Sequence, residues 1–308
     1  MSEPLVIGVD AGGTKLLGGV MKRDGTIVRR REVPTAKTSE KALLDGVDDL
    51  VESLMEDDVG ALGFGIPSTI DQRTGQAVWS ANIPLADEPF RERYAERFSL
   101  PVGIDNDANA AAIAEWKVGA GRGTNHMIML TLGTGVGGGL ILDGRPYRGA
   151  VGAAAELGHV VVEFDGRPCG SFCKGRGHIE AYATGVAASR DAADAFGDGA
   201  DSHVLLERAR AGDHVALEVL DGIARRLGAT MGSFVNIFNP EAIVIGGGWG
   251  KAAGDLLLER AREVMEREAL SPGRELVRIV PAQLGPEAGL VGAGFVAFEA
   301  LDAASKLH

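Results

Sequence analysis

The sequence predicts an α/β protein of two similar domains, each built from a mixed β-sheet with flanking helices. Two observations support this prediction. The chain opens with a strand, a glycine-rich turn and a second strand that ends at Asp-Gly, and the same order recurs in weaker form near its middle. With 308 residues, of which 45% are hydrophobic, the chain is also long and apolar enough for two packed cores.

The first half of the chain predicts three strands and then alternating helices and strands. Apolar runs bounded by turn residues indicate the strands, and apolar residues three or four positions apart indicate the helices. The expected strands are 5–10, 16–21, 27–33, 61–66 and 102–104, and the expected helices are 43–55, 88–98 and an alanine-rich segment that ends near 118.

The second half repeats the opening pattern after a connection at residues 119–125. Setting Thr131 against Asp10 aligns Gly133 with Gly12, and both predicted hairpins end in Asp-Gly. This match favours two similar domains that face one another. The expected elements are strands 127–132 and 140–142 around a glycine turn at 133–139, helix 214–238, strand 242–245, helix 252–268, strand 276–280 and helix 287–303.

The composition disfavours some classes of partner. A net charge of −12 would repel polyanions, because nonspecific nucleic-acid affinity comes from lysine and arginine that neutralise phosphates. The chain starts without a basic region followed by a long apolar stretch, and no apolar run reaches membrane-spanning length. We therefore expect a soluble, cytoplasmic protein with no nucleic-acid or membrane partner. The two cysteines, separated by three residues, also favour a reducing compartment.

A candidate metal centre contains both cysteines and two of the six histidines. His159, Cys169, Cys173 and His178 offer the nitrogen and sulfur ligands that a tetrahedral structural zinc takes. Their order, His-x9-Cys-x3-Cys-x4-His, differs from zinc-finger spacing and predicts a metal clip on a loop inside a larger domain. With four protein ligands, such a zinc would position side chains and leave no site for a hydrolytic water. The alternative is two buried thiols beside two ordinary surface histidines.

The first glycine turn, from Asp10 to Lys15, predicts a phosphate site. Gly12 and Gly13 allow backbone N–H groups close to a phosphate, Thr14 and Lys15 add a hydroxyl and a charge, and Asp10 is suited to hold Mg²⁺ through water. The turn joins two strands and misses the Walker pattern G-x4-G-K-[S/T] by one residue. The alternative is a plain hairpin turn, which would need neither the aspartate nor the lysine.

The second glycine turn formally satisfies the dinucleotide pattern G-x-G-x-x-G. That motif requires the glycines to open a helix, whereas a strand and a hairpin follow here, so a dehydrogenase is not expected. A third glycine cluster, between a strand and an expected helix, is suited to hold the other end of a nucleotide, although glycine there also serves simple packing. These candidate nucleotide contacts are Gly133, Thr134, Gly135, Gly246, Gly247 and Gly248.

The segment Asp105-Asn-Asp-Ala-Asn109 lies where an expected strand meets an expected helix. Such a position presents a carboxylate to a cleft, with the helix N-terminus beneath it. Our hypothesis is that Asp107 is the base that takes a proton from an attacking hydroxyl. The alternative is helix capping by Asn106 or Asp107, which explains one of these residues but not four polar groups.

Together these motifs resemble ROK-family sugar kinases in kind and in order. The matching segments are Asp10–Lys15, Gly65-Ile-Pro67, Asp105–Asn109, Leu132–Gly138, Ala155–His159 and the Cys/His loop that ends at Glu180, so the resemblance covers essentially the whole chain. It implies the two-domain actin-like ATPase (ribonuclease H-like) fold. The implied domains are 1–118, with the first phosphate hairpin and Asp107, and 119–308, with the second hairpin and the zinc loop. The last helix is expected to pack back on the first domain.

The resemblance implies an ATP-dependent hexose kinase, in the first place a glucokinase that converts ATP and D-glucose to ADP and glucose 6-phosphate. Asp107 is similar to the catalytic base of the family, and Mg²⁺ would bridge the ATP phosphates. A structural Zn²⁺ would bind one ring nitrogen of His159 and leave the other facing the sugar. A homodimer or a dimer of dimers is expected. The residues similar to sugar ligands are Asn82, Asn106, Asp107, Glu156, His159 and Glu180.

Three features depart from the family pattern. The usual metal loop is His-x9-Cys-x-Cys-x4-Cys, whereas here residues 170–172 separate the cysteines and His178 replaces the last thiol. Two cysteines and two histidines are an ordinary zinc set, but the loop must be reshaped. Ser68 replaces the glycine after Gly-x-Pro, so sugar preference is expected to differ, and Ala155 replaces the first glycine of Gly-Glu-Leu-Gly-His.

Several alternatives remain open from the sequence. Fructose, mannose or an N-acetylated sugar is an alternative acceptor, and polyphosphate is an alternative donor, which the acidic balance of the chain mildly disfavours. Members of the same family also act as sugar-responsive repressors, for which we expect a helix-turn-helix before the first strand and find no room. A sugar sensor without catalysis is a further alternative.

Overall fold

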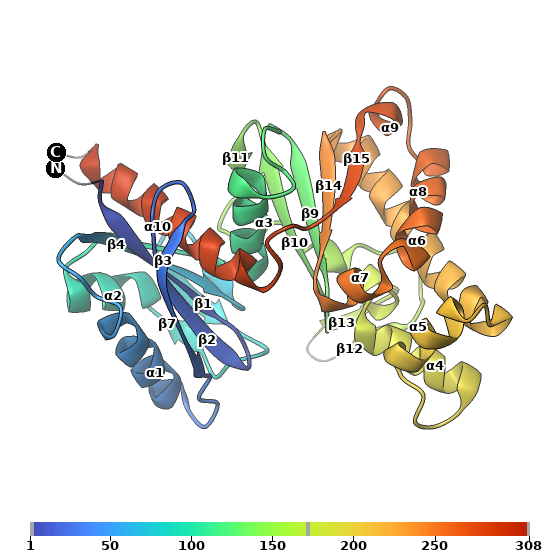
Figure 1. The fold of residues 1–308 in the computed structure, drawn as a ribbon, viewed down its shortest axis with the longest axis horizontal. Coiled ribbons are helices and arrows are strands. Elements are labelled where there is room, and N and C mark those ends of the chain that lie inside the picture. The colour runs from blue at the N-terminus through green and yellow to red at the C-terminus, as the bar shows by residue number, and fades with distance from the viewer. Residues whose placement is uncertain (1–2, 171–172, 307–308) are drawn as a thin grey trace.

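A computed structural model describes residues 3–170 and 173–306, which form two lobes side by side (Figure 1). The strands of the first lobe are β1 (Leu5–Ala11), β2 (Lys15–Met21), β3 (Ile27–Pro34), β4 (Val59–Ile66) and β8 (Val102–Asn106). They form one sheet in the order β3-β2-β1-β4-β8. β2 pairs antiparallel with both β1 and β3, whereas β1, β4 and β8 are parallel.

The second lobe repeats this topology. Its strands are β9 (Met127–Leu132), β10 (Val136–Leu142), β11 (Arg145–Pro146), β14 (Ala242–Gly246) and β15 (Arg278–Pro281), in the order β11-β10-β9-β14-β15. An antiparallel hairpin again precedes parallel strands. Asp10 pairs with Gly65 of the next parallel strand, and Thr131 pairs with Gly246 in the same way. The predicted α/β fold of two similar halves is therefore confirmed, and the repeat extends from the hairpins to the whole sheets.

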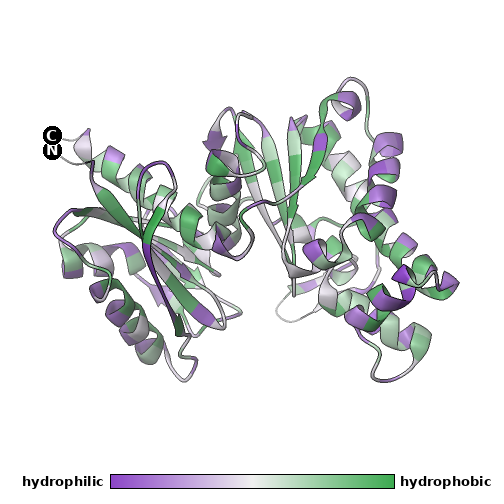
Figure 2. Cartoon of the chain, in the orientation of Figure 1, coloured by the Kyte–Doolittle hydropathy of each residue, from purple (hydrophilic) through white to green (hydrophobic). Residues whose placement is uncertain are grey.

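Helices cover the outer face of each sheet and enclose an apolar core on either side of the molecule (Figures 1 and 2). In the first lobe, α1 begins because Ser39 accepts a hydrogen bond from the Ala42 N–H, and its buried residues follow a helical spacing. In the second lobe, Asp213 caps the long α6 through the N–H groups of Val215 and Ala216. The outer helices are α1 (Glu40–Glu52), α2 (Phe90–Phe98), α4 (Gly185–Phe196), α5 (Ser202–Arg210), α6 (His214–Phe238), α7 (Gly248–Ala253), α8 (Asp255–Glu268) and α9 (Gly273–Leu276).

Two helices, α3 (Asp107–Val118) and α10 (Ala288–Ser305), form the layer between the sheets. α10 lies on the first sheet so closely that a Cβ at Gly63 or Gly103 would overlap its backbone. α3 lies on β10, where a Cβ at Gly139 would overlap Ala112. The two helices also contact each other, since Gly292 has no room for a side chain beside Ala110. This layer places the start of α3 between the lobes.

The burial of α10 explains its composition. By length and composition alone, residues 285–305 would be apolar enough to cross a membrane, and 56% of the 18-residue apolar window within them is buried inside the protein. A helix packed between a sheet and a second helix is apolar on most of its surface for the same reason that a membrane helix is. We therefore interpret α10 as a core helix.

The chain passes between the lobes twice, after α3 and before α10. One buried carboxylate accepts hydrogen bonds from the backbone of both connecting segments. Glu115 of α3 is fully buried. Its Oε1 accepts hydrogen bonds from the N–H groups of Gln283 and Leu284, at 2.9 and 2.7 Å. Its Oε2 accepts one from the Ala120 N–H at 2.8 Å. Glu115 thus holds together the two connections between the lobes.

Some predicted element boundaries were wrong. The loop between β4 and α2 contains a small sheet of β5 (Thr69–Asp71), β6 (Gln76–Trp79) and β7 (Ala86–Glu88). The helices α4 and α5 were not predicted. The expected helix 252–268 is divided at Gly254, whose φ of 50° ends α7. A hairpin of β12 (Pro168–Gly170) and β13 (Cys173–Arg176) carries the two cysteines.

Candidate active site

The predicted site residues gather where the central strands of both sheets end. Asp10 lies near the end of β1, and Asn106 is the last residue of β8. In the second lobe, Gly133 follows β9 and Gly246 ends β14. The carboxyl ends of parallel strands meet at one edge of a sheet, where ligands of open α/β folds bind. Each lobe therefore contributes one such edge.

Asp107 is the first residue of α3, directly after β8. Asn106 is the cap of this helix, because its side-chain oxygen accepts hydrogen bonds from the N–H groups of Ala108 and Asn109, at 2.9 and 3.3 Å. Capping therefore accounts for Asn106 and not for the carboxylate of Asp107. Asp107 Oδ1 accepts a hydrogen bond from the Ala108 N–H at 2.9 Å. Helix geometry thus fixes where this carboxylate lies.

Asp107 lies close enough to Asp10 to affect the ionisation of its carboxyl group. Burial raises the pKa of Asp10 to about 7, the charge of Asp107 adds to this effect, and Lys15 opposes it. Burial likewise raises the pKa of Asp107, against the hydrogen bond from its helix. Asp10 also lies against the start of α10, where a Cβ at Gly289 would overlap its carboxylate. Two crowded acids of this kind are suited to a cation or to proton transfer.

Glu156 and Glu180 extend this acidic cluster from the second lobe. Partial burial of the carboxyl group raises the pKa of Glu156, His159 opposes the effect, and the charges of Glu180 and Asp107 add to it. The Glu156 side chain is 60% exposed, so a ligand can reach it, and its Oε2 lies 4.0 Å from Nε2 of His159. Glu180 Oε2 accepts a hydrogen bond from the Val136 N–H at 2.9 Å. The structure thus brings carboxylates from both lobes to one place.

The first glycine turn is a tight hairpin tip, as predicted. Residues 12–14 join β1 to β2, and Thr14 is exposed. Lys15 begins β2, and its Nζ lies 2.9 Å from Oε2 of Glu32 on β3. Asn82, an exposed residue from the loop after β6, lies beside Gly13, with its Cβ 3.5 Å from the position that a Cβ of Gly13 would take. Asn82 therefore lies beside the glycine hairpin of the first lobe.

The second glycine turn also connects two strands. The Gly133 N–H donates to the carbonyl of Gly135 at 2.9 Å, and β10 begins at Val136. Because a strand and not a helix follows, the dinucleotide interpretation is excluded, as the sequence predicted. Gly247 has a φ of 84° and lies so close to Leu132 that a Cβ would overlap its backbone. The 246–248 loop therefore lies next to the second hairpin.

The four candidate metal ligands come together. The ligand atoms of His159, Cys169, Cys173 and His178 all lie within 4.8 Å of one another. The two Nδ1 atoms are 3.2 Å apart, and each is 3.5 Å from a sulfur, His159 from Cys169 and His178 from Cys173. Tetrahedral zinc, with bonds of about 2.0 Å to nitrogen and about 2.3 Å to sulfur, places two nitrogens about 3.3 Å apart and a nitrogen and a sulfur about 3.5 Å apart. The donor set therefore fits zinc.

The metal cluster also directs side chains toward the acidic cluster. His159 faces the other ligands through Nδ1, which leaves Nε2 on the side of Glu156. Glu180 Oε1 lies 3.8 Å from the Sγ of Cys169. The cysteines are on paired strands, with Gly170 opposite Cys173. The additional residues relative to the family pattern, Ser171 and Phe172, lie outside the described part of the chain.

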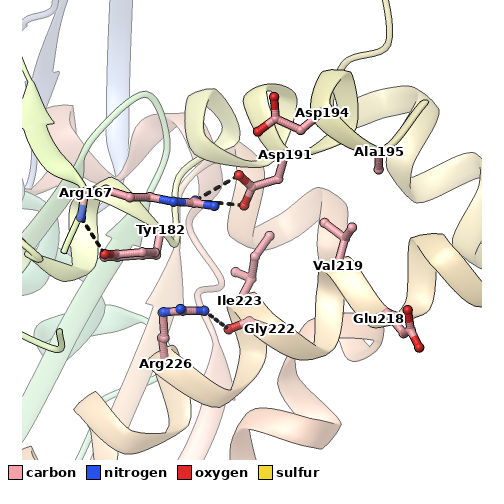
Figure 3. A pocket seen from close by; sticks show the side chains of 10 residues that line it. All are labelled: Arg167, Tyr182, Asp191, Asp194, Ala195, Glu218, Val219, Gly222, Ile223 and Arg226. Carbon is pink, nitrogen blue, oxygen red and sulfur yellow. Dashed lines mark hydrogen bonds and ion pairs between the residues drawn. The ribbon is translucent and has the colours of Figure 1, made fainter. Parts of the chain in front are cut away.

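Two arginines fix the outer side of the metal loop by lying on opposite sides of the Tyr182 ring (Figure 3). The guanidinium carbons of Arg167 and Arg226 are 5.0 and 4.5 Å from the ring centroid. Arg167 also donates its backbone N–H to the Tyr182 hydroxyl at 2.8 Å and forms an ion pair with Asp191 of α4. These residues border a hollow of about 360 Å³ whose lining includes none of the predicted site residues. We interpret the side chains around this hollow as the support of the metal loop.

Ser68, where the family pattern has glycine, is buried in the first lobe. Its hydroxyl donates to the carbonyl of Trp79 at 2.7 Å and lies 3.2 Å from that of Thr69. The hydroxyl therefore ties β6 to the end of β4 instead of facing a ligand. The expected change in sugar preference would have to act through the shape of this loop.

Sequence reasoning missed Arg148, which forms an ion pair with Asp105 just before Asp107. Asp105 is only 1% exposed, and a buried carboxylate requires a cationic or hydrogen-bonding partner. Because Asp105 lies at the end of an apolar strand, the sequence could have indicated a buried carboxylate that needs a cationic partner. Nothing in the spacing of the sequence indicates which arginine it is.

Comparison with known proteins relates this geometry to one family. Residues 6–300 match the sequence profile of the ROK family. The chain is 36% identical to the glucokinase of Streptomyces coelicolor, over 96% of this chain and 98% of that protein. The structure of a ROK family glucokinase from Streptomyces griseus in complex with glucose and AMPPNP has 37% identity and a TM-score of 0.79, over 96% of this chain and 99% of its own. The ROK hexokinase from Thermus thermophilus has 35% identity and a TM-score of 0.85, over 97% and 99%.

Proposed function

This chain belongs to the ROK family, and we propose that it is a glucokinase that transfers the γ-phosphoryl group of ATP to D-glucose. The observation that carries this proposal is the position of Asp107, at the start of a helix between the lobes, among carboxylates from both of them. Phosphoryl transfer needs a positioned hydroxyl, a base for its proton and charge neutralisation on the phosphates. The site has candidate residues for each of these three requirements, which are described in turn below.

Asp107 is the proposed general base. Its carboxylate would accept the proton of the sugar 6-hydroxyl as that oxygen attacks phosphorus. The raised pKa of Asp107 makes it a better proton acceptor than an exposed aspartate would be, provided that it is ionised when the sugar binds. The proposed sugar ligands are Asn82, Asn106, Glu156, His159 and Glu180.

The two glycine hairpins and the 246–248 loop are the proposed ATP site. The hairpin tips belong to opposite lobes, and their glycines would let backbone N–H groups approach phosphates. Asp10 fits a Mg²⁺ site, because a buried acid crowded by a second acid gains from a nearby cation. When bound, Mg²⁺ would neutralise charge on the phosphates. The proposed contacts are Gly12, Gly13, Thr14, Lys15, Gly133, Thr134, Gly135, Gly246, Gly247 and Gly248.

The proposed zinc is structural. The four protein donors would complete a tetrahedron, so that the ion would fix the ring of His159 and the loop that carries Glu180. His159 Nε2 and the Glu156 carboxylate would then face the sugar together.

We also propose that residues 1–118 and 119–308 behave as two domains that close on the substrates, with α10 packed on the first of them. Closure would exclude the water that otherwise competes for the phosphoryl group. Homodimerisation and a cytoplasmic location are part of the same proposal.

A coupled ADP-release assay over a panel of hexoses, with ATP or polyphosphate as donor, tests the proposed function. We expect glucose with Mg²⁺-ATP to give the highest kcat/KM, and glucose 6-phosphate to be the product by mass spectrometry. A preference for mannose, fructose or an N-acetylated hexose would show that the protein is a hexose kinase with a different acceptor sugar. Sugar binding without ADP or phosphate release from any donor would contradict the kinase and support a sensor.

A further inference from the structure

A buried ion pair connects the lobes beside the proposed base. Arg148 Nε donates to Asp105 Oδ2 at 2.6 Å, with the side chain of Asp105 only 1% exposed and that of Arg148 23% exposed. Arg148 follows β11 of the second sheet, and Asp105 lies on β8 of the first. Charge-assisted hydrogen bonds in such surroundings are short and strong, and losing one partner leaves a costly unpaired charge.

The second oxygen of Asp105 holds the first turn of α3. Asp105 Oδ1 accepts hydrogen bonds from the Asn106 N–H at 2.9 Å and from Nδ2 of the buried Asn109 at 3.1 Å. Asn106 is the cap of the helix, and Asp107 lies between these two contacts in the chain. The direction of the Asp107 side chain therefore depends on a carboxylate that Arg148 binds.

The segment that carries Arg148 leads directly to Glu156. Within residues 147–155 the chain touches the first lobe, where the Val151 carbonyl accepts a hydrogen bond from the Gln72 N–H at 2.8 Å. The side chain of Gln72 in turn donates to the carbonyl of Ile104, next to Asp105. Arg148 also reaches α10, because one of its terminal nitrogens lies 2.8 Å from Oε2 of Glu299. One guanidinium thus lies between the segment that ends at Glu156 and the strand that ends before Asp107.

We propose that Arg148 is a positioning residue that aligns the sugar-binding segment of the second lobe with the proposed base on the first. This inference rests on the proposed glucokinase function and deepens it. Without the guanidinium, the Asp105 carboxylate would have to rearrange or admit water. The first turn of α3 and the segment at 147–155 would then lose their common anchor, although neither Asp107 nor Glu156 is changed.

The test compares Arg148→Met, Arg148→Lys and Asp105→Asn in the full-length protein. We expect Arg148→Met to lower kcat at least tenfold with a smaller change in glucose KM, and Arg148→Lys to recover part of that loss by keeping the charge. The double variant Arg148→Met/Asp105→Asn should be no worse than Arg148→Met alone, since the two residues act as a pair. A folded Arg148→Met enzyme with kcat within twofold of wild type would overturn the proposal. If Arg148→Met does not fold, a kcat of Asp105→Asn within twofold of wild type would overturn it instead.

Arg23→Met is the matched control. Arg23 forms a two-contact ion pair with Asp302 at 2.7 and 2.9 Å, also reaching α10, and is not part of the proposed site. We expect its kcat to stay within twofold of wild type, and an equal loss in both variants would contradict a specific role for Arg148.

Hydrogen exchange separates this inference from the proposed function. If the wild-type protein phosphorylates no sugar, faster exchange of the 106–110 amides in Arg148→Met, but not in Arg23→Met, would still support the coupling, and unchanged exchange would refute it.

Discussion

The Oε2 atom of Glu180 lies 2.9 Å from the backbone nitrogen of Val136 and accepts its hydrogen bond. This contact links the metal loop to the second glycine hairpin, because Val136 is the first residue of β10. The contact engages one lone pair of Oε2, and Oε1 lies 3.8 Å from the Sγ of Cys169, so both oxygens of Glu180 already have neighbours in the protein. We therefore propose that the exposed Glu156, more than Glu180, accepts sugar hydroxyls through both of its carboxylate oxygens.

Replacing Glu180 with glutamine tests this arrangement. The amide can keep one acceptor but loses the charge, and a hydrogen bond to a charged group is worth about 1.5–3 kcal/mol. We expect Glu180→Gln to raise the glucose KM by roughly 10-fold or more, with a smaller effect on ATP. Steady-state kinetics with each substrate varied in turn would measure the KM values for glucose and ATP. Glu163→Gln, which removes an exposed ion pair with Arg226, is the control, and an unchanged glucose KM in Glu180→Gln would remove it from the sugar site.

Metal analysis tests the zinc centre. Protein purified without chelators should contain one zinc per chain by plasma mass spectrometry, because the donor distances fit a tetrahedral ion. We expect Cys173→Ser to lower the zinc content and weaken glucose binding more than ATP binding, since the ion would orient His159. A zinc-free protein with full activity would refute the structural role.

The pKa of Asp10 predicts how stability varies with pH. Its value is about 7 in the folded protein, against an ordinary value of 3.8. The folded state therefore holds more protons than the unfolded chain between these values, and its stability falls as the pH rises from about 4 to about 7. Asp10→Asn lacks this titration. We expect its free energy of unfolding, relative to wild type, to increase over that range in urea titrations without nucleotide, and a constant difference would contradict the assigned pKa.

Replacing one carboxylate oxygen of Glu115, which binds both connections between the lobes, should destabilise the protein. In Glu115→Gln, the amide nitrogen would face a backbone N–H donor at one crossing, and each unsatisfied buried group costs about 1–3 kcal/mol. We expect a loss of that order in the free energy of unfolding, measured with denaturant. Glu263→Gln, which affects an exposed pair with Arg260, should change it little. Equal stability of the two variants would show that the crossings do not depend on this carboxylate.

The features that the sequence predicted correctly are those with local signals. A strand, a glycine turn and an Asp-Gly pair lie within about twenty residues of one another, so the two hairpins were recognisable. The metal centre was recognisable because cysteine and histidine are rare here and carry specific chemistry. The long helix predicted from about residue 214 to 238 was confirmed as α6, since its apolar spacing continues without interruption.

The features that were missed depend on contacts far apart in the chain. Arg148 is 43 residues from Asp105, and Glu115 is 168 residues from Gln283. No periodicity indicates such partners. The small sheet at 69–88 was missed because its strands are only three or four residues long. Asn82 and Glu180 were assigned by resemblance, and only the fold shows that they lie beside opposite hairpins.

The most direct test of the account is to measure glucose binding and phosphoryl transfer in the same preparation of Asp107→Asn. The substitution keeps the shape of the side chain but removes the base, whose contribution is typically at least about 100-fold in rate. The account predicts a dissociation constant for glucose near that of wild type, with turnover lower by that factor. Near-normal turnover in a folded Asp107→Asn protein would contradict it.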